Sequence, residues 1–258
     1  MSSRSVIWSV TAVRITRLDS AGRQTMNRPT YWADASHPSA DAAGEMAAAL
    51  ASTSLAFQSK NPEYAQKCLK YANALKDFAA KYPSASYDGI GSFYASGSQN
   101  DDVAWADLWC AIANNGGKLP DSYRPISVSQ GVYEGNQYDY WIYSWDKVWG
   151  GYAALLYSQG RESYGNELVF EMDKLISNKT QYFPIGGWGG SRYNCAWQMY
   201  ALTYAKYSGS STYNEYAKSQ MDTLLGAKLC KPHLPAGMPE IPGRSTFITE
   251  LPIRIRIL

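Results

Sequence analysis

The chain of 258 residues is short of several residue types, and each shortage excludes a class of protein. Charged residues are only 18% and the net charge is +2, so the charge of the chain gives no reason to expect a nucleic-acid partner. Two histidines, His37 and His233, are too few for a usual zinc site. The apolar run over 6–13 is too short and too interrupted for a secretory signal or a membrane span.

Cysteine is also scarce, and its spacing favours free thiols. No C-x-x-C pair occurs, and the first three cysteines lie in apolar helical contexts, which are typical of buried thiols. The four are Cys68, Cys110, Cys195 and Cys230.

Aromatic residues are abundant, at 14% of the chain, and Trp and Tyr far outnumber Phe. There are 9 Trp and 21 Tyr but only 6 Phe, whereas a plain hydrophobic core would favour Phe. The excess indicates surfaces that stack on amphipathic groups such as sugar rings. Tyrosines on helix exteriors are the other explanation, and composition leaves both open.

The two ends differ in composition from the middle. Residues 29–230 hold 12 Lys and 3 Arg, whereas the remaining residues hold 1 Lys and 8 Arg. All 21 Tyr lie within 31–216. Either the ends are genuine irregular segments, or the reading frame has shifted at both ends and left residues that were not selected to fold with the body. We favour the second explanation.

Between the ends, apolar residues recur at helical spacing, and Gly, Pro, Ser and Asn separate the runs. No hairpin signal interrupts them, so the sequence predicts an all-α array of paired helices. The predicted helices cover 40–58, 62–82, 101–114, 145–158, 164–177, 191–207 and 212–225.

Residues 28–45, RPTYWADASHPSADAAGE, carry a family resemblance. They resemble the segment R-P-x-Y-x-x-D-A-S-x-P-x-x-D-x-A-G-E of glycoside hydrolase family 9, the cellulase family built on an (α/α)6 barrel. The resemblance implies an incomplete (α/α)6 barrel over 26–226, after a divergent segment 1–25 and before an irregular tail 227–258. Within the segment it implies a structural role for Asp41 and Glu45.

Residues 97–105, GSQNDDVAW, resemble the family's S-G-Y-x-D-E-L-x-W stretch, which binds a structural calcium. The resemblance implies Ca²⁺ ligands from the carbonyls of Gly97 and Ser98 and the side chains of Asp101, Asp102 and Asp146. The last of these matches a family S-W-D motif, and Asp102 replaces the family's usual Glu. The alternative is that Asp101 and Asp102 cap a helix and favour its dipole.

Residues 186–194, GGWGGSRYN, resemble W-G-x-x-R-Y-x-x-N of the same family, although the Asn position is Ala196 here. The resemblance implies substrate-binding roles for Trp188, Arg192 and Tyr193, and a further aromatic platform at Trp141. The alternative for Trp188 and Arg192 is packing over a loop and a salt bridge. We assign Trp145 and Trp149, four residues apart, to packing.

The sequence assigns no catalytic residue. Glycosidic hydrolysis needs two carboxyl groups across the scissile bond. The family's N-terminal D-A-G-D motif, its H-x-R segment and its C-terminal acid motif have no match here. We therefore expect a truncated endoglucanase of family 9, weak or inactive in hydrolysing β-1,4-glucosidic bonds of cellulose.

Two other functions stay open: a non-catalytic carbohydrate-binding helical module, and a helical scaffold that binds no sugar. The expected partner is cellulose or a β-glucan oligosaccharide, without nucleic acid or membrane. The family resemblance implies a secreted or cell-surface protein, and the sequence leaves its oligomeric state open.

Overall fold

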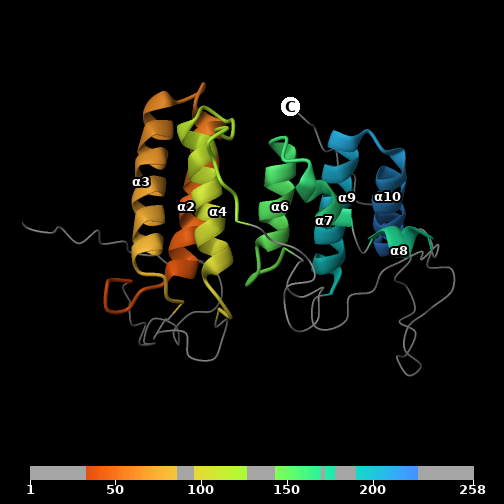
Figure 1. The fold of residues 1–258 in the computed structure, drawn as a ribbon, viewed down its shortest axis with the longest axis horizontal. Helices are drawn as coiled ribbons and strands as arrows, with labels where there is room; N and C mark the ends of the chain where they lie inside the picture. The colour runs from red at the N-terminus through yellow and green to blue at the C-terminus, as the bar shows by residue number, and fades with distance from the viewer. Residues whose placement is uncertain (1–32, 86–95, 127–142, 170–171, 178–189, 226–258) are drawn as a thin grey trace, which may run out of the picture.

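The computed structural model describes residues 33–85, 96–126, 143–169, 172–177 and 190–225, and the secondary structure within these ranges is helical. Figure 1 shows the longer helices running roughly alongside one another. They are α2 (Ala40–Phe57), α3 (Pro62–Lys81), α4 (Asn100–Asn114), α6 (Trp149–Ser158), α7 (Ser163–Val169), α8 (Met172–Ser177), α9 (Ser191–Ser208) and α10 (Ser211–Leu224). The predicted all-α class is confirmed.

Helices α2, α3 and α4 pack together through small side chains. Helix α3 starts with Pro62 in its first turn, and the side chain of the N-cap residue Asn61 accepts a hydrogen bond from Tyr64 N at 3.1 Å. Helix α2 buries mainly alanines and one glycine, so its neighbours can approach closely. The buried small residues of α2 are Ala40, Ala43, Gly44, Ala47, Ala48, Ala51 and Ser54.

The larger core joins α4 to the helices that follow it. It includes Leu108 and Ile112 of α4, Tyr152 and Leu156 of α6, and Tyr200 of α9. Helices α9 and α10 add a buried polar contact, in which Asn194 Nδ2 donates to Gln220 Oε1 at 3.1 Å. This pairing satisfies two amides that would be costly to bury alone.

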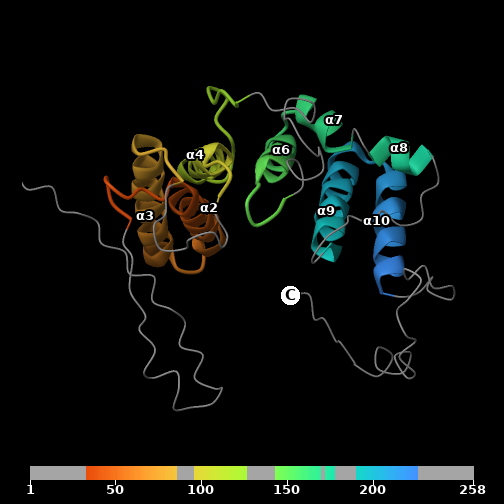
Figure 2. The same ribbon diagram turned by 90° about the horizontal axis from the view of Figure 1, so that it is seen from below.

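The helices form one curved row, with α3, α2 and α4 on one side and α6, α9 and α10 on the other (Figures 1 and 2). The colour gradient in Figure 1 shows that α4, α6 and α9 all begin at its lower end. The loops that enter these three helices therefore share one end of the molecule.

Two predicted helices differ from the structure by more than one residue. The helix predicted from 145 begins at Trp149, because Ser144 N donates to Lys147 O at 2.8 Å and closes a turn ahead of it. The helix predicted over 164–177 corresponds to two, α7 and α8. In the described part of the chain, no helix has the length and apolar character needed to span a membrane.

The predicted buried thiols are confirmed for Cys68 and Cys110, whereas Cys195 is half-buried. All three are free, and burial raises the pKa of the Cys110 thiol to about 12. A thiol held in its neutral form is a weak nucleophile, so Cys110 serves packing.

Gly44 sets the approach of α2 to α4, and we expect Gly44→Ala to destabilise the fold by about 2 kcal/mol or more. A Cβ atom at this position would lie 2.6 Å from the carbonyl oxygen of Asp102, which is rigid backbone. The measurement is the urea unfolding midpoint, with Ala42→Ser on the exposed face of α2 as the control. Equal midpoints for the two variants would contradict the conclusion that Gly44 sets the distance between α2 and α4.

Candidate functional site

The predicted site residues that the structure describes gather at the end where α4, α6 and α9 begin (Figure 1). Gly97, Ser98, Asp101 and Asp102 lead into and start α4, and Asp146 precedes α6. Arg192 and Tyr193 lie in the first turn of α9. Trp141 and Trp188 lie outside the described residues, each two positions before a described segment.

Asp101 links the beginnings of α4 and α6. Its side chain is fully buried, and its Oδ2 accepts a hydrogen bond from Val148 N, the N-cap residue of α6, at 2.9 Å. Its Oδ1 is also buried and has no hydrogen-bond partner among the described residues. Burial raises the pKa of Asp101, while the Val148 amide and the positive charge of Lys147 act against that rise. Asp101 thus joins the first turn of α4 to the N-cap of α6.

Asp146 approaches the same space from the turn before α6. Its Oδ1 accepts a hydrogen bond from Gly97 N at 3.0 Å, and its Oδ2 lies 3.1 Å from Lys147 Nζ. The carbonyl of Ser98 accepts a bond from Ser96 Oγ at 2.9 Å, which folds the loop ahead of α4. The structure therefore places Gly97, Asp101 and Asp146, three of the five residues in the predicted ligand set, near one another.

Asp102 faces in another direction. Its Cβ lies 3.0 Å from the position a Cβ atom would take on Gly44, so the side chain is directed toward α2. There its carboxyl group hydrogen-bonds that of Glu45. Burial, with the nearby charges of Asp101 and Glu45, raises the pKa of Asp102 to about 9. One proton shared between the two carboxyl groups explains how they can lie so close.

The oxygen atoms around Gly97 provide some, but not all, of the ligands that a hard cation needs. Calcium prefers several carboxylate and carbonyl oxygens, and the unpartnered Asp101 Oδ1 is the kind of atom that such an ion would engage. Within the described ranges, however, no group of three or more His, Cys, Asp and Glu side chains converges as a metal site. A cation here would depend on backbone carbonyls as well as on Asp101 and Asp146.

Arg192 and Tyr193 pair at the start of α9, where Arg192 is exposed and Tyr193 is half-buried against the core. Arg192 Nη2 donates to Tyr193 Oη at 2.7 Å, and its guanidinium carbon lies 4.6 Å from the centroid of that ring. Such a pair can offer N–H donors and a ring edge to a ligand.

Sequence reasoning missed one aromatic residue at this end. Trp149 is buried, as predicted, but Trp145 is 52% exposed, so its assignment to packing is wrong. It lies in the turn before α6, outside any helix, and the helical spacing on which the assignment rested therefore does not apply. The segment is fixed to α9, because Tyr143 N donates to the buried hydroxyl of Tyr200 at 2.7 Å.

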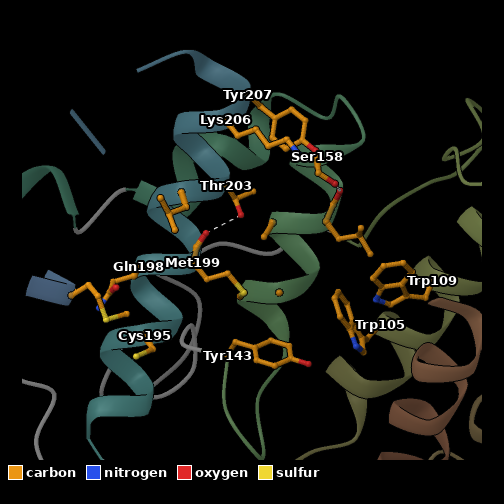
Figure 3. A pocket seen from close by; sticks show the side chains of 15 residues that line it. Trp105, Trp109, Tyr143, Ser158, Cys195, Gln198, Met199, Thr203, Lys206 and Tyr207 are labelled. Carbon is orange, nitrogen blue, oxygen red and sulfur yellow. Dashed lines mark hydrogen bonds between the residues drawn. The ribbon is translucent and has the colours of Figure 1, made fainter. Parts of the chain in front are cut away.

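A groove of about 690 Å3 runs between α4, α6 and α9, and Figure 3 shows Trp105 and Trp109 facing Met199 across it. Among the residues that the structure describes, no acidic side chain lines this groove, and these residues supply none of the carboxyl groups that glycosidic hydrolysis needs. Its surface is mainly apolar, with Met199 and Leu202 each more than 40% exposed.

Comparison with known proteins decides the family. The family model for glycosyl hydrolase family 9 matches residues 10–231 of this chain. The chain belongs to glycosyl hydrolase family 9. As a family 9 member, it has the paired helices of an incomplete (α/α)6 barrel. The domain boundaries at 25 and 226 fall outside the described residues and stay predictions.

Three relatives show the extent of the likeness. Endoglucanase 15 of Arabidopsis thaliana is 29% identical over 71% of this family 9 chain and 40% of its own length. Endoglucanase CX of Prunus persica is 30% identical, over 77% of this chain and 92% of its own. The catalytic domain of Clostridium thermocellum CelT superposes with a TM-score of 0.62 at 29% identity, over 78% of this chain and 47% of that domain. The chain thus spans less than half the length of Endoglucanase 15 and of the CelT domain.

The paired carboxyl groups of Asp102 and Glu45 make the stability of this family 9 chain depend on pH. Because the pKa of Asp102 is about 9 when folded and near 3.8 when unfolded, the unfolded chain binds fewer protons between these values. The free energy of unfolding should therefore fall as pH rises from about 4 to about 9. We expect Asp102→Asn to reduce that slope in urea unfolding at pH 5 and pH 8 with a chelator present.

Asp121→Asn, a change at an exposed acid after α4, is the control and should leave the slope unchanged. A slope in the Asp102 variant as steep as in the parent chain would refute the shared-proton interpretation.

Proposed function

We propose that this chain functions in endoglucanase-type hydrolysis of β-1,4-glucosidic bonds in cellulose or a related β-glucan. The observation that carries the proposal is the family 9 match over residues 10–231, supported by the superposition on the CelT catalytic domain. The relatives that match are endoglucanases by name. Secretion or display at the cell surface is part of the same proposal.

In this proposal the end of the molecule at which α4, α6 and α9 begin contributes to the substrate cleft. Arg192 is exposed there and contacts the half-buried Tyr193, and Trp145 adds an indole that is 52% exposed. Aromatic faces bind the apolar sides of sugar rings, and guanidinium groups donate to hydroxyls. Trp141 and Trp188 complete the proposed sugar-binding set.

The acids that cluster in the described residues have structural partners. Asp101 accepts the Val148 amide, Asp102 pairs with Glu45, and Asp146 accepts the Gly97 amide. A catalytic carboxyl group must reach the scissile bond with its proton free to move. We therefore assign these acids to the scaffold and no catalytic role to any of them.

We also propose a structural calcium ion at the beginning of α4, held by Asp101, Asp146 and the carbonyls of Gly97 and Ser98. The support is the buried, unpartnered Asp101 Oδ1 beside a second carboxylate. Asp102 could join them only by giving up its bond to Glu45. The ion would fix the loop that leads into α4 and supply no step of the hydrolysis.

The proposed function is tested by reducing-sugar release from carboxymethylcellulose, measured on the purified 258-residue chain with and without calcium. We expect weak release or none, with the helical circular dichroism signal intact, since the acids that cluster here are structural. Strong release abolished by Arg192→Ala would show that the chain itself carries an acid and a base, and that our scaffold assignment is wrong.

Sugar binding is tested separately by titrating cellooligosaccharide and following Trp fluorescence. We expect Arg192→Ala to weaken binding by roughly tenfold, because that is about the loss in affinity when one hydrogen bond from a charged group is removed. Tyr64→Ala is the matched control, because Tyr64 is 44% exposed and begins α3 at the opposite end of the helices. Binding without turnover favours a carbohydrate-binding module, and no binding at all contradicts the proposed cleft.

A further inference from the structure

Lys147 is a nearly buried cation at the acidic end of the molecule. It lies between Asp146 and the N-cap residue of α6, and its side chain is only 12% exposed. Lysine is rarely buried to this degree unless it is paired, because its ammonium group loses hydration. Its Nζ lies 3.1 Å from Asp146 Oδ2, so the pair compensates part of that cost.

The ammonium group also lies against the backbone of Gly97. A Cβ atom on Gly97 would be 3.2 Å from Lys147 Nζ and 3.2 Å from Asp146 Oδ2, so both charged groups lie close to the backbone of this glycine. Lys147 also acts electrostatically on Asp101, whose buried Oδ1 lacks a hydrogen-bond partner in the described part of the chain. The lysine therefore lies among three residues that the calcium proposal uses as ligands.

We propose that Lys147 is the resident counter-ion of this site, and that calcium binds only by displacing its ammonium group from Asp146. The inference rests on the calcium site proposed above. Two cations within a few ångströms repel each other strongly where water is scarce, so ammonium and metal alternate. The lysine holds the loop before α4 onto the turn before α6 when calcium is absent, and it lowers the calcium affinity.

The test compares the full chain with Lys147→Met, which keeps an unbranched side chain one atom shorter and removes its charge. We expect isothermal titration to show calcium binding about tenfold tighter in the variant. In a chelator we expect the variant to unfold at a lower temperature than the parent, and added calcium should restore more of that loss than in the parent. Lys118→Met, at an exposed lysine in the loop after α4, should change neither quantity.

Each outcome separates the two proposals. Equal calcium affinity in the parent and in Lys147→Met would overturn the displacement while leaving the calcium site. No calcium binding to either protein would overturn the calcium site, and the displacement with it. Should Lys147→Met fail to fold, Lys147→Arg keeps the charge and should preserve the weak affinity of the parent. Tight binding by the arginine variant would contradict our inference.

Discussion

The hydrogen bond from Val148 N to Asp101 Oδ2 is the contact on which the arrangement of the helices depends. It joins the first turn of α4 to the N-cap of α6, where the alanine-rich helices α2–α4 meet the aromatic core of α6–α10. The Tyr143 ring supports the same seam, because it packs on Gly151 of α6 and edge-on against Trp105 of α4. Polar and aromatic contacts thus act together with the shared hydrophobic core where the two groups of helices meet.

The signature segment of the sequence is structural in this chain. Gly44 lets the backbone of α4 approach α2, and Glu45 provides the partner of Asp102. Asp41 accepts a hydrogen bond from Ser39 Oγ at 2.9 Å where α2 begins. These residues, which carry the family resemblance, therefore pack α2 against α4, and the residues that we propose for sugar binding come from other segments.

Much of the fold could be predicted from the sequence, because helix formation depends on local signals. Pro62, the Gly116–Gly117 pair and the apolar spacing placed α3 and α4 within one residue of their bounds. The site was less predictable, because its geometry depends on contacts between distant segments. Adjacent acids at 101 and 102 gave no sign that one would face α6 and the other α2. The exposure of Trp145 depended on a turn that interrupts the helical period.

The shared direction of α4, α6 and α9 has an electrical consequence. Each α-helix carries a partial positive charge of about half an elementary charge at its N-terminus, and three such ends lie together here (Figure 1). Their macrodipoles add, so the backbone offsets part of the negative charge of the acids gathered at that end. Because Asp101 and Asp102 of α4 and Trp149 of α6 are buried, this positive potential acts mainly on the acids themselves and less on groups in the solvent.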